Sequence, residues 1–129
     1  MIYAGIGARA TPSFSINIMN KFGKFMGSNG HVLRSGAAYG ADAAFEKGCD
    51  EAQGMKEIFI PWKGFNDSLS ELFDVSIGAS NLAKKFHPAW SKLSQGGQKL
   101  MARNCYQLLG YDLNTPSDFV VCWTKDGYN

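Results

Sequence analysis

Apolar residues along the chain alternate between short continuous runs and helical spacings. Residues 2–6 (IYAGI) form a continuous apolar run that turn-forming residues follow, which predicts a buried strand. From Ser13 onward apolar residues recur at threes and fours, which predicts an amphipathic helix with Ser13 as its N-cap and an end within the glycine-containing stretch 27–30. The inner face of this helix is expected to consist of Phe14, Ile18, Met19, Phe22, Phe25 and Met26.

The same alternation continues as far as residue 61. The pattern predicts a strand over 31–35, a helix over about 41–53 and a strand over 57–61 that ends at a proline. The helix is expected to turn Ala44, Phe45 and Cys49 inward and to end at Gly54. Strands that alternate with helices in this way indicate a Rossmann-like α/β fold, a parallel sheet with helices on both faces in three α/β/α layers.

The pattern is weaker after residue 61. Residues 62–68 suggest a loop, 69–85 a helix with only moderate periodicity, 86–93 a surface loop, and 118–123 a fourth strand. A clearer helix is predicted over about 97–109, with an apolar stripe of Leu100, Met101, Cys105, Leu108 and Leu109. Because an open sheet usually adds a helix and a strand after this point, residues 1–129 are expected to form one Rossmann-like domain that is either small or truncated at its C-terminus.

Composition and charge narrow the classes of function. The chain is 45% hydrophobic and 19% charged, which is typical of a globular protein, and its net charge of +2 is too small to attract a polyanion globally. Any phosphate recognition must therefore be local. No apolar run is long enough to span a membrane and no export signal is present, so the sequence predicts a cytoplasmic protein without membrane contacts. The odd number of cysteines and their wide spacing predict reduced thiols.

The turn after the first strand is a candidate phosphate site. It contains Gly5, Gly7, Ala8, Arg9 and Thr11. Glycines let the backbone approach a phosphate, and the following helix N-terminus presents free N–H groups. Arginine adds a cation that can form a bidentate pair of hydrogen bonds with a phosphate. Taken alone, the same residues also suit a tight turn with a surface arginine.

The turn after the second strand repeats this arrangement. Its candidate ligand-binding residues are Ser35, Gly36, Ala37, Tyr39, Gly40 and Asp42. Ser35 is expected to donate to a phosphate oxygen and Tyr39 to stack on a base. Two interpretations of Asp42 remain open: it caps the second helix, or it accepts a hydrogen bond from a ribose hydroxyl or an amide.

Other chemistry-bearing residues give weaker signals. Trp62 and Lys63, which follow the third strand, are candidates for base stacking and phosphate contact, although a capped strand end with core aromatics explains them equally well. His87 lies in a predicted loop without a second ligand at metal spacing, and His31 opens a strand. No nucleophile–base pair and no metal or cofactor motif emerges, so we expect no cofactor.

The two glycine turns resemble motifs of a known family. Residues 7–12 (GARATP) and 35–42 (SGAAYGAD) are similar to the G-x-R-x-x-S and S-G-x-A-x-G-[IA]-D motifs of the DNA-processing protein A (DprA/Smf) family within the SMF/LOG group. Arg103 and Asn104, on a helix before the strand that begins at Asp118, resemble in their order the family's R-N pair and its D-x-V-x-V strand. The resemblance covers about residues 2–123 and is closest to the short DprA-like proteins of phages.

The resemblance implies an extended Rossmann domain that binds single-stranded DNA, a nucleotide or a nucleotide-derived signal. It implies a pocket lined by Gly7, Arg9, Ser35, Gly36, Gly40 and Asp42, with Arg103 and Asn104 beside it. The chain departs from the family in having no glycine- and threonine-rich turn after the fourth strand, and it lacks the P-G-G-x-G-T-x-x-E signature of the phosphoribohydrolase branch.

These observations favour a binding protein without catalytic activity, whose partner is single-stranded DNA or a nucleotide. Two alternatives remain. One is an N-glycosidic hydrolase of nucleoside monophosphates that uses Asp42 or Glu46, and the other is a sensor or sequestering protein for an ADP-ribose-like signal. The sequence is also compatible with a homo-oligomer.

Overall fold

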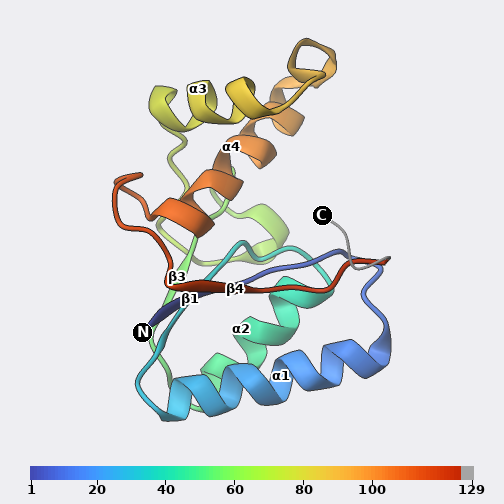
Figure 1. Ribbon diagram of the computed structural model, residues 1–129, viewed down its shortest axis with the longest axis vertical. Coiled ribbons are helices and arrows are strands. Elements are labelled where there is room, and N and C mark those ends of the chain that lie inside the picture. Colours follow the sequence, from blue (N-terminus) through green and yellow to red (C-terminus); the bar gives the residue numbers. More distant parts are fainter. Residues whose placement is uncertain (126–129) are drawn as a thin grey trace.

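A four-stranded parallel sheet lies at the centre of the protein, whose computed structural model describes residues 1–125 (Figure 1). The strands are β1 (Ile2–Gly5), β2 (Val32–Ser35), β3 (Lys56–Ile58) and β4 (Phe119–Val121), in the order β3-β2-β1-β4. All three pairings are parallel, with Tyr3 aligned with Leu33 on one side and with Phe119 on the other. The predicted Rossmann-like α/β class is confirmed.

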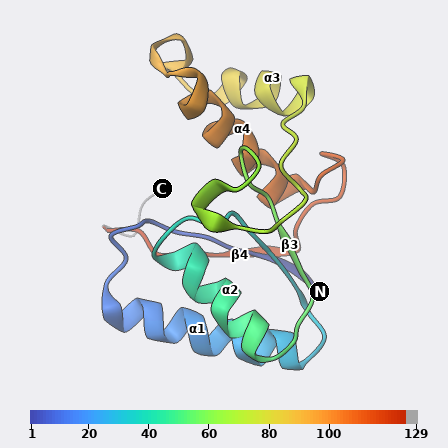
Figure 2. The same cartoon turned by 180° about the vertical axis from the view of Figure 1, so that it is seen from behind.

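Helices cover both faces of this sheet. Helices α1 (Ser13–Ser28) and α2 (Ala41–Glu51) pack together on one face, while α4 (Gln95–Leu109) lies over the other and carries α3 (Ile77–Phe86) on its far side (Figures 1 and 2). Two short 3₁₀ helices, η1 (Phe65–Asp67) and η2 (Trp90–Lys92), lie in the connections. Within residues 1–125 no helix combines the length and the apolar character that a membrane span needs.

The main core lies between the sheet and the α1–α2 layer. Tyr3 is fully buried, stacks on Phe119 and meets the edges of Phe22 and Phe45. Its hydroxyl finds no hydrogen-bond partner among the described residues. A second cluster forms where Phe59 meets Tyr106 of α4, beneath α3. Aromatic residues thus contact both helical layers: Tyr3 of β1 meets α1 and α2, and Phe59, which follows β3, meets α4.

The predicted inner face of α1 is wrong in part. Met19 and Met26 are buried, but Phe14, Ile18 and Phe25 are 76%, 53% and 61% exposed. The reason is a close approach to α2 through glycine: a Cβ on Gly23 would lie 2.5 Å from the main-chain oxygen of Phe45. A glycine does not count as an apolar position in the sequence pattern, yet the contact at Gly23 determines which face of α1 is buried.

The beginnings of several helices also differ from the prediction. Ser13 is the first helical residue of α1 rather than its cap, since Pro12 in extended conformation occupies the cap position. The helix predicted over 69–85 begins only at Ile77, where the Ser76 side chain accepts the N–H of Ala79. Similarly, Ser94 accepts the N–H of Gly97 and starts α4 two residues earlier than expected.

The predicted apolar stripe of α4 is wrong in part: Leu100, Met101 and Cys105 are partly buried and pack against the core. The buried residues are Ala102, Arg103, Tyr106 and Gln107, whereas Leu108 is 44% exposed. Arg103 can occupy the inner face because main-chain carbonyls of Gly36 and Phe59 lie opposite it and accept its N–H groups. This packing places polar groups at the edge of the sheet.

Candidate functional site

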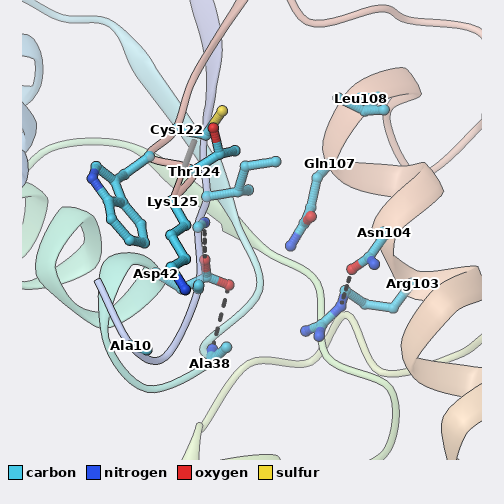
Figure 3. Close-up of a pocket in the computed structure, with 14 residues that line it drawn as sticks. Ala10, Ala38, Asp42, Arg103, Asn104, Gln107, Leu108, Cys122, Thr124 and Lys125 are labelled. Atoms are coloured by element: carbon cyan, nitrogen blue, oxygen red, sulfur yellow. Dashed lines mark hydrogen bonds between the residues drawn. The ribbon is translucent and has the colours of Figure 1, made fainter. Parts of the chain in front are cut away.

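A cleft of about 670 Å³ opens at the carboxyl ends of β1 and β4 (Figure 3). From β1 the chain continues to β2 and β3 on one side of the sheet, whereas β4 pairs with β1 on the other side. The strand order therefore reverses its direction between β1 and β4. Ligands of open parallel sheets bind at this kind of position. The lining comes from two loops, from α4 and from the segment after β4: Ile6, Gly7, Ala8, Ala10, Ala38, Asp42, Arg103, Asn104, Gln107, Leu108, Cys122, Trp123, Thr124 and Lys125.

The two predicted glycine turns come together at this cleft. The carboxylate of Asp42 accepts the N–H of Gly7 at 3.2 Å and the N–H of Ala38 at 3.4 Å, and so joins the first turn to the second. Gly40 has φ of 85°, and a Cβ there would lie 2.7 Å from the main-chain oxygen of Ala8. Only glycine permits this contact between the loops.

The capping interpretation of Asp42 is wrong, because Gly40 occupies the N-cap of α2 and Asp42 lies inside the first turn. Its side chain is almost fully buried at the floor of the cleft. Burial raises the pKa of Asp42 to about 6, although Arg103 and the N–H groups of Ala38, Gly7 and Gly36 favour the ionised form. At neutral pH the cleft therefore contains a carboxylate that can accept a hydroxyl or amide proton.

Arg103 holds three segments together beside this carboxylate. One terminal nitrogen donates to the main-chain oxygens of Gly36 and of Phe59, and Nε donates to Asn104 Oδ1 at 3.0 Å. The guanidinium also lies over the Phe65 ring, 5.4 Å from its centroid. No hydrogen bond from the second terminal nitrogen is found among residues 1–125. Arg103 thus fixes the loop after β2 and keeps donor groups for a ligand.

The hydroxyl groups of two predicted site residues, Ser35 and Thr11, are already engaged in the loops. The fully buried hydroxyl of Ser35 donates to the main-chain oxygen of Gly5 at 2.6 Å. Thr11 likewise donates to the main-chain oxygen of Ala8 at 2.6 Å. Both side chains shape the turns, so direct donation to a phosphate would require one of these bonds to break.

The remaining predicted residues are divided between the cleft and its surroundings. Gly36 adjoins the cleft, because a Cβ there would collide with Arg103 and Gln107, and Ala37 follows it with φ of 59°. The exposed residues Arg9, Tyr39, Trp62 and Lys63 do not line the cleft. Tyr39 instead borders a separate hollow of about 770 Å³ that contains Glu46.

Several lining residues escaped the sequence analysis. Gln107 lies one helical turn after Arg103, and its side chain extends toward the cleft together with Asn104 (Figure 3). The segment 122–125 follows the fourth strand and supplies Trp123 and the exposed Lys125. The end of the strand predicted over 118–123 was a signal that could have identified this segment, because ligands lie at the carboxyl ends of parallel strands.

Metal binding and disulfide bonding receive no support from the geometry. Nowhere in the described part of the chain do three His, Cys, Asp or Glu residues converge. Cys49, Cys105 and Cys122, all within residues 1–125, are unpaired. Comparison with known proteins finds no matching family model, no matching curated protein and no matching solved structure.

Proposed function

We propose that the cleft binds a nucleotide, either free or as one unit of a single-stranded DNA. The observation that carries this proposal is the position of a buried carboxylate and a buried arginine at the point where the strand order changes direction, the usual ligand position in open parallel sheets. The volume of about 670 Å³ lies in the range of small-molecule sites.

Each chemical part of a nucleotide has a partner in the cleft. Asp42 is an acceptor for a sugar hydroxyl or a base amino group, because its ionised form has no proton to donate. Leu108 and Trp123 provide apolar surface for the base. The second terminal nitrogen of Arg103 and the ammonium group of Lys125 are the cations available to a phosphate.

The family resemblance stays part of this proposal. The motif-bearing segments 7–12 and 35–42 lie together and meet Arg103 and Asn104, which is the arrangement that a relative of DNA-processing protein A would need. On this proposal the protein acts in the cytoplasm, and a single strand presents one nucleotide to the cleft.

A second candidate is hydrolysis of an N-glycosidic bond, and the raised pKa of Asp42 favours it. A carboxyl group with a pKa of about 6 is suited to proton transfer near neutral pH. Glu46, the other carboxylate considered, forms an ion pair with Lys56 at 2.9 Å and borders the separate hollow. Release of free base from nucleoside monophosphates that is lost in Asp42→Asn would establish this activity and replace the binding role.

Calorimetric titration with nucleoside mono- and diphosphates tests the proposal. Lys125→Glu reverses an exposed charge at the cleft and is expected to weaken binding about tenfold, which corresponds to about 1.4 kcal/mol. Lys47→Glu makes the same change on the exposed side of α2 and should leave affinity unchanged. Failure of all these nucleotides and of an oligothymidylate to bind at low salt would refute the proposal, as would equal effects of the two substitutions.

A further inference from the structure

The small net charge conceals an uneven distribution along the chain. Residues 75–111, which include α3 and α4, contain five cations and neither Asp nor Glu, whereas the rest of the chain has eight cations and eleven acids. This segment therefore carries a charge of +5 against −3 for the remainder. A separation of this size creates a local field that the total of +2 does not reveal.

Four of the five cations gather at the connection between α3 and α4. Lys84 and Lys85 lie in the last turn of α3, Lys92 in η2 and Lys99 in the second turn of α4, and all four are exposed. Both views place this connection at the end of the molecule farthest from α1 (Figures 1 and 2). We call Lys84, Lys85, Phe86, Lys92 and Lys99 the hairpin patch.

The charges of the hairpin patch are not neutralised within the described chain. The ion pairs among residues 1–125 join Arg34 to Glu57 and Lys56 to two acids of α2, and none involves the patch. Phe86 is 74% exposed, with the Lys85 ammonium 5.8 Å from its ring centroid. An aromatic face beside cations is the combination that stacks a base and holds its phosphate.

Helix stability does not account for the whole patch. Lys84 and Lys85 complement the negative end of the α3 dipole, which stabilises that helix. Lys92 and Lys99, however, lie at the N-terminal end of α4, where the dipole disfavours cations and where the first turn contains no acid. A bound anion would offset the unfavourable interaction of both lysines with this end of the helix dipole.

We propose that the hairpin patch binds the backbone of a single-stranded nucleic acid, with its lysines on successive phosphates and Phe86 against a base. A single strand is favoured over a membrane because one exposed phenylalanine offers little apolar surface for insertion among four lysines. The surface is independent of the cleft and stands whether or not the cleft binds a nucleotide.

Fluorescence anisotropy of a labelled oligothymidylate of about twelve nucleotides, at salt from about 20 to 300 mM, tests this surface. Four phosphate contacts predict a slope of about −2.8 for log affinity against log salt. The double substitution Lys84→Ala with Lys85→Ala should reduce it to about −1.4 and weaken binding about 25-fold at 0.1 M salt. Phe86→Ala should weaken binding at least about fivefold without changing the slope.

The matched control is Lys21→Ala with Lys24→Ala, which removes two exposed lysines from α1 and should leave affinity and slope unchanged. The inference is overturned if the oligothymidylate does not bind at the lowest salt, or if the control loses as much affinity as the hairpin variant. A duplex of equal length that binds as tightly would also contradict it. So would binding to phosphatidylserine vesicles alone, lost with the hairpin lysines.

Discussion

Asp42→Asn should change the stability of this protein in a way that reverses with pH. The substitution replaces a buried carboxylate by an amide of nearly the same shape. In the native protein the two carboxylate oxygens accept the N–H groups of Gly7 and Ala38. The oxygen of the introduced amide can keep one of these bonds, but its NH₂ group would then face a second N–H donor. We expect this mismatch to cost about 1–2 kcal/mol at every pH.

The pH-dependent part follows from the pKa of Asp42. Burial raises this pKa from 3.8 to about 6, so between these values the native state holds a proton that the unfolded chain releases. The stabilising effect of that proton is complete below pH 3.8 and is lost as the pH rises through 6. A shift of one pKa unit corresponds to about 1.4 kcal/mol. The shift from 3.8 to about 6 therefore lowers the unfolding free energy by about 3 kcal/mol between low and neutral pH.

The two contributions have opposite signs at neutral pH. Near pH 3.5 the variant should be about 1–2 kcal/mol less stable than the wild type, because only the lost hydrogen bond matters. Near pH 7 the variant avoids a buried charge and should be about 1–2 kcal/mol more stable. The difference in unfolding free energy should therefore change sign between these conditions.

Urea unfolding followed by tryptophan fluorescence, at several pH values from about 3.5 to 7.5, measures this difference. Asp74→Asn serves as the control, since Asp74 is exposed and its carboxylate has no hydrogen bond among the described residues; its difference from wild type should stay small and flat. A difference for Asp42→Asn that is constant over the whole pH range would refute the reasoning about its burial. So would a variant that is about 2 kcal/mol less stable at pH 7.

Two substitutions test the packing around the site. Tyr3→Phe removes a buried hydroxyl without a partner and should raise the unfolding free energy by about 1 kcal/mol; a loss of stability on urea unfolding would show that the hydroxyl is satisfied. Gly40→Ala should lower the melting temperature far more than Gly64→Ala, because both glycines have positive φ but only Gly40 faces a loop carbonyl, that of Ala8, while Gly64 faces open space. Equal effects of the two substitutions on thermal unfolding would contradict the tight contact between the loops.

The sequence by itself determined the order of elements and the position of the glycine turns. Short apolar runs bounded by turn residues identified β1 and β2 within a residue of their limits, and the helical spacing placed Phe45 and Cys49 of α2 correctly in the core. These features are local, because they depend on neighbours within a few positions of the chain. Parallel strands then bring their carboxyl ends to one edge, which is why the two turns were expected to lie together.

Only the tertiary structure decided which polar groups face the cleft and which helix faces are buried. The bond from Ser35 to Gly5 spans 30 residues and that from Arg103 to Gly36 spans 67, and neither partner identifies the other in a single sequence. The buried arginine of α4 is compatible with its position only because loop carbonyls from distant segments satisfy it. Hydrophobic periodicity measures the tendency to avoid water, whereas burial of a polar side chain depends on partners that folding alone brings within reach.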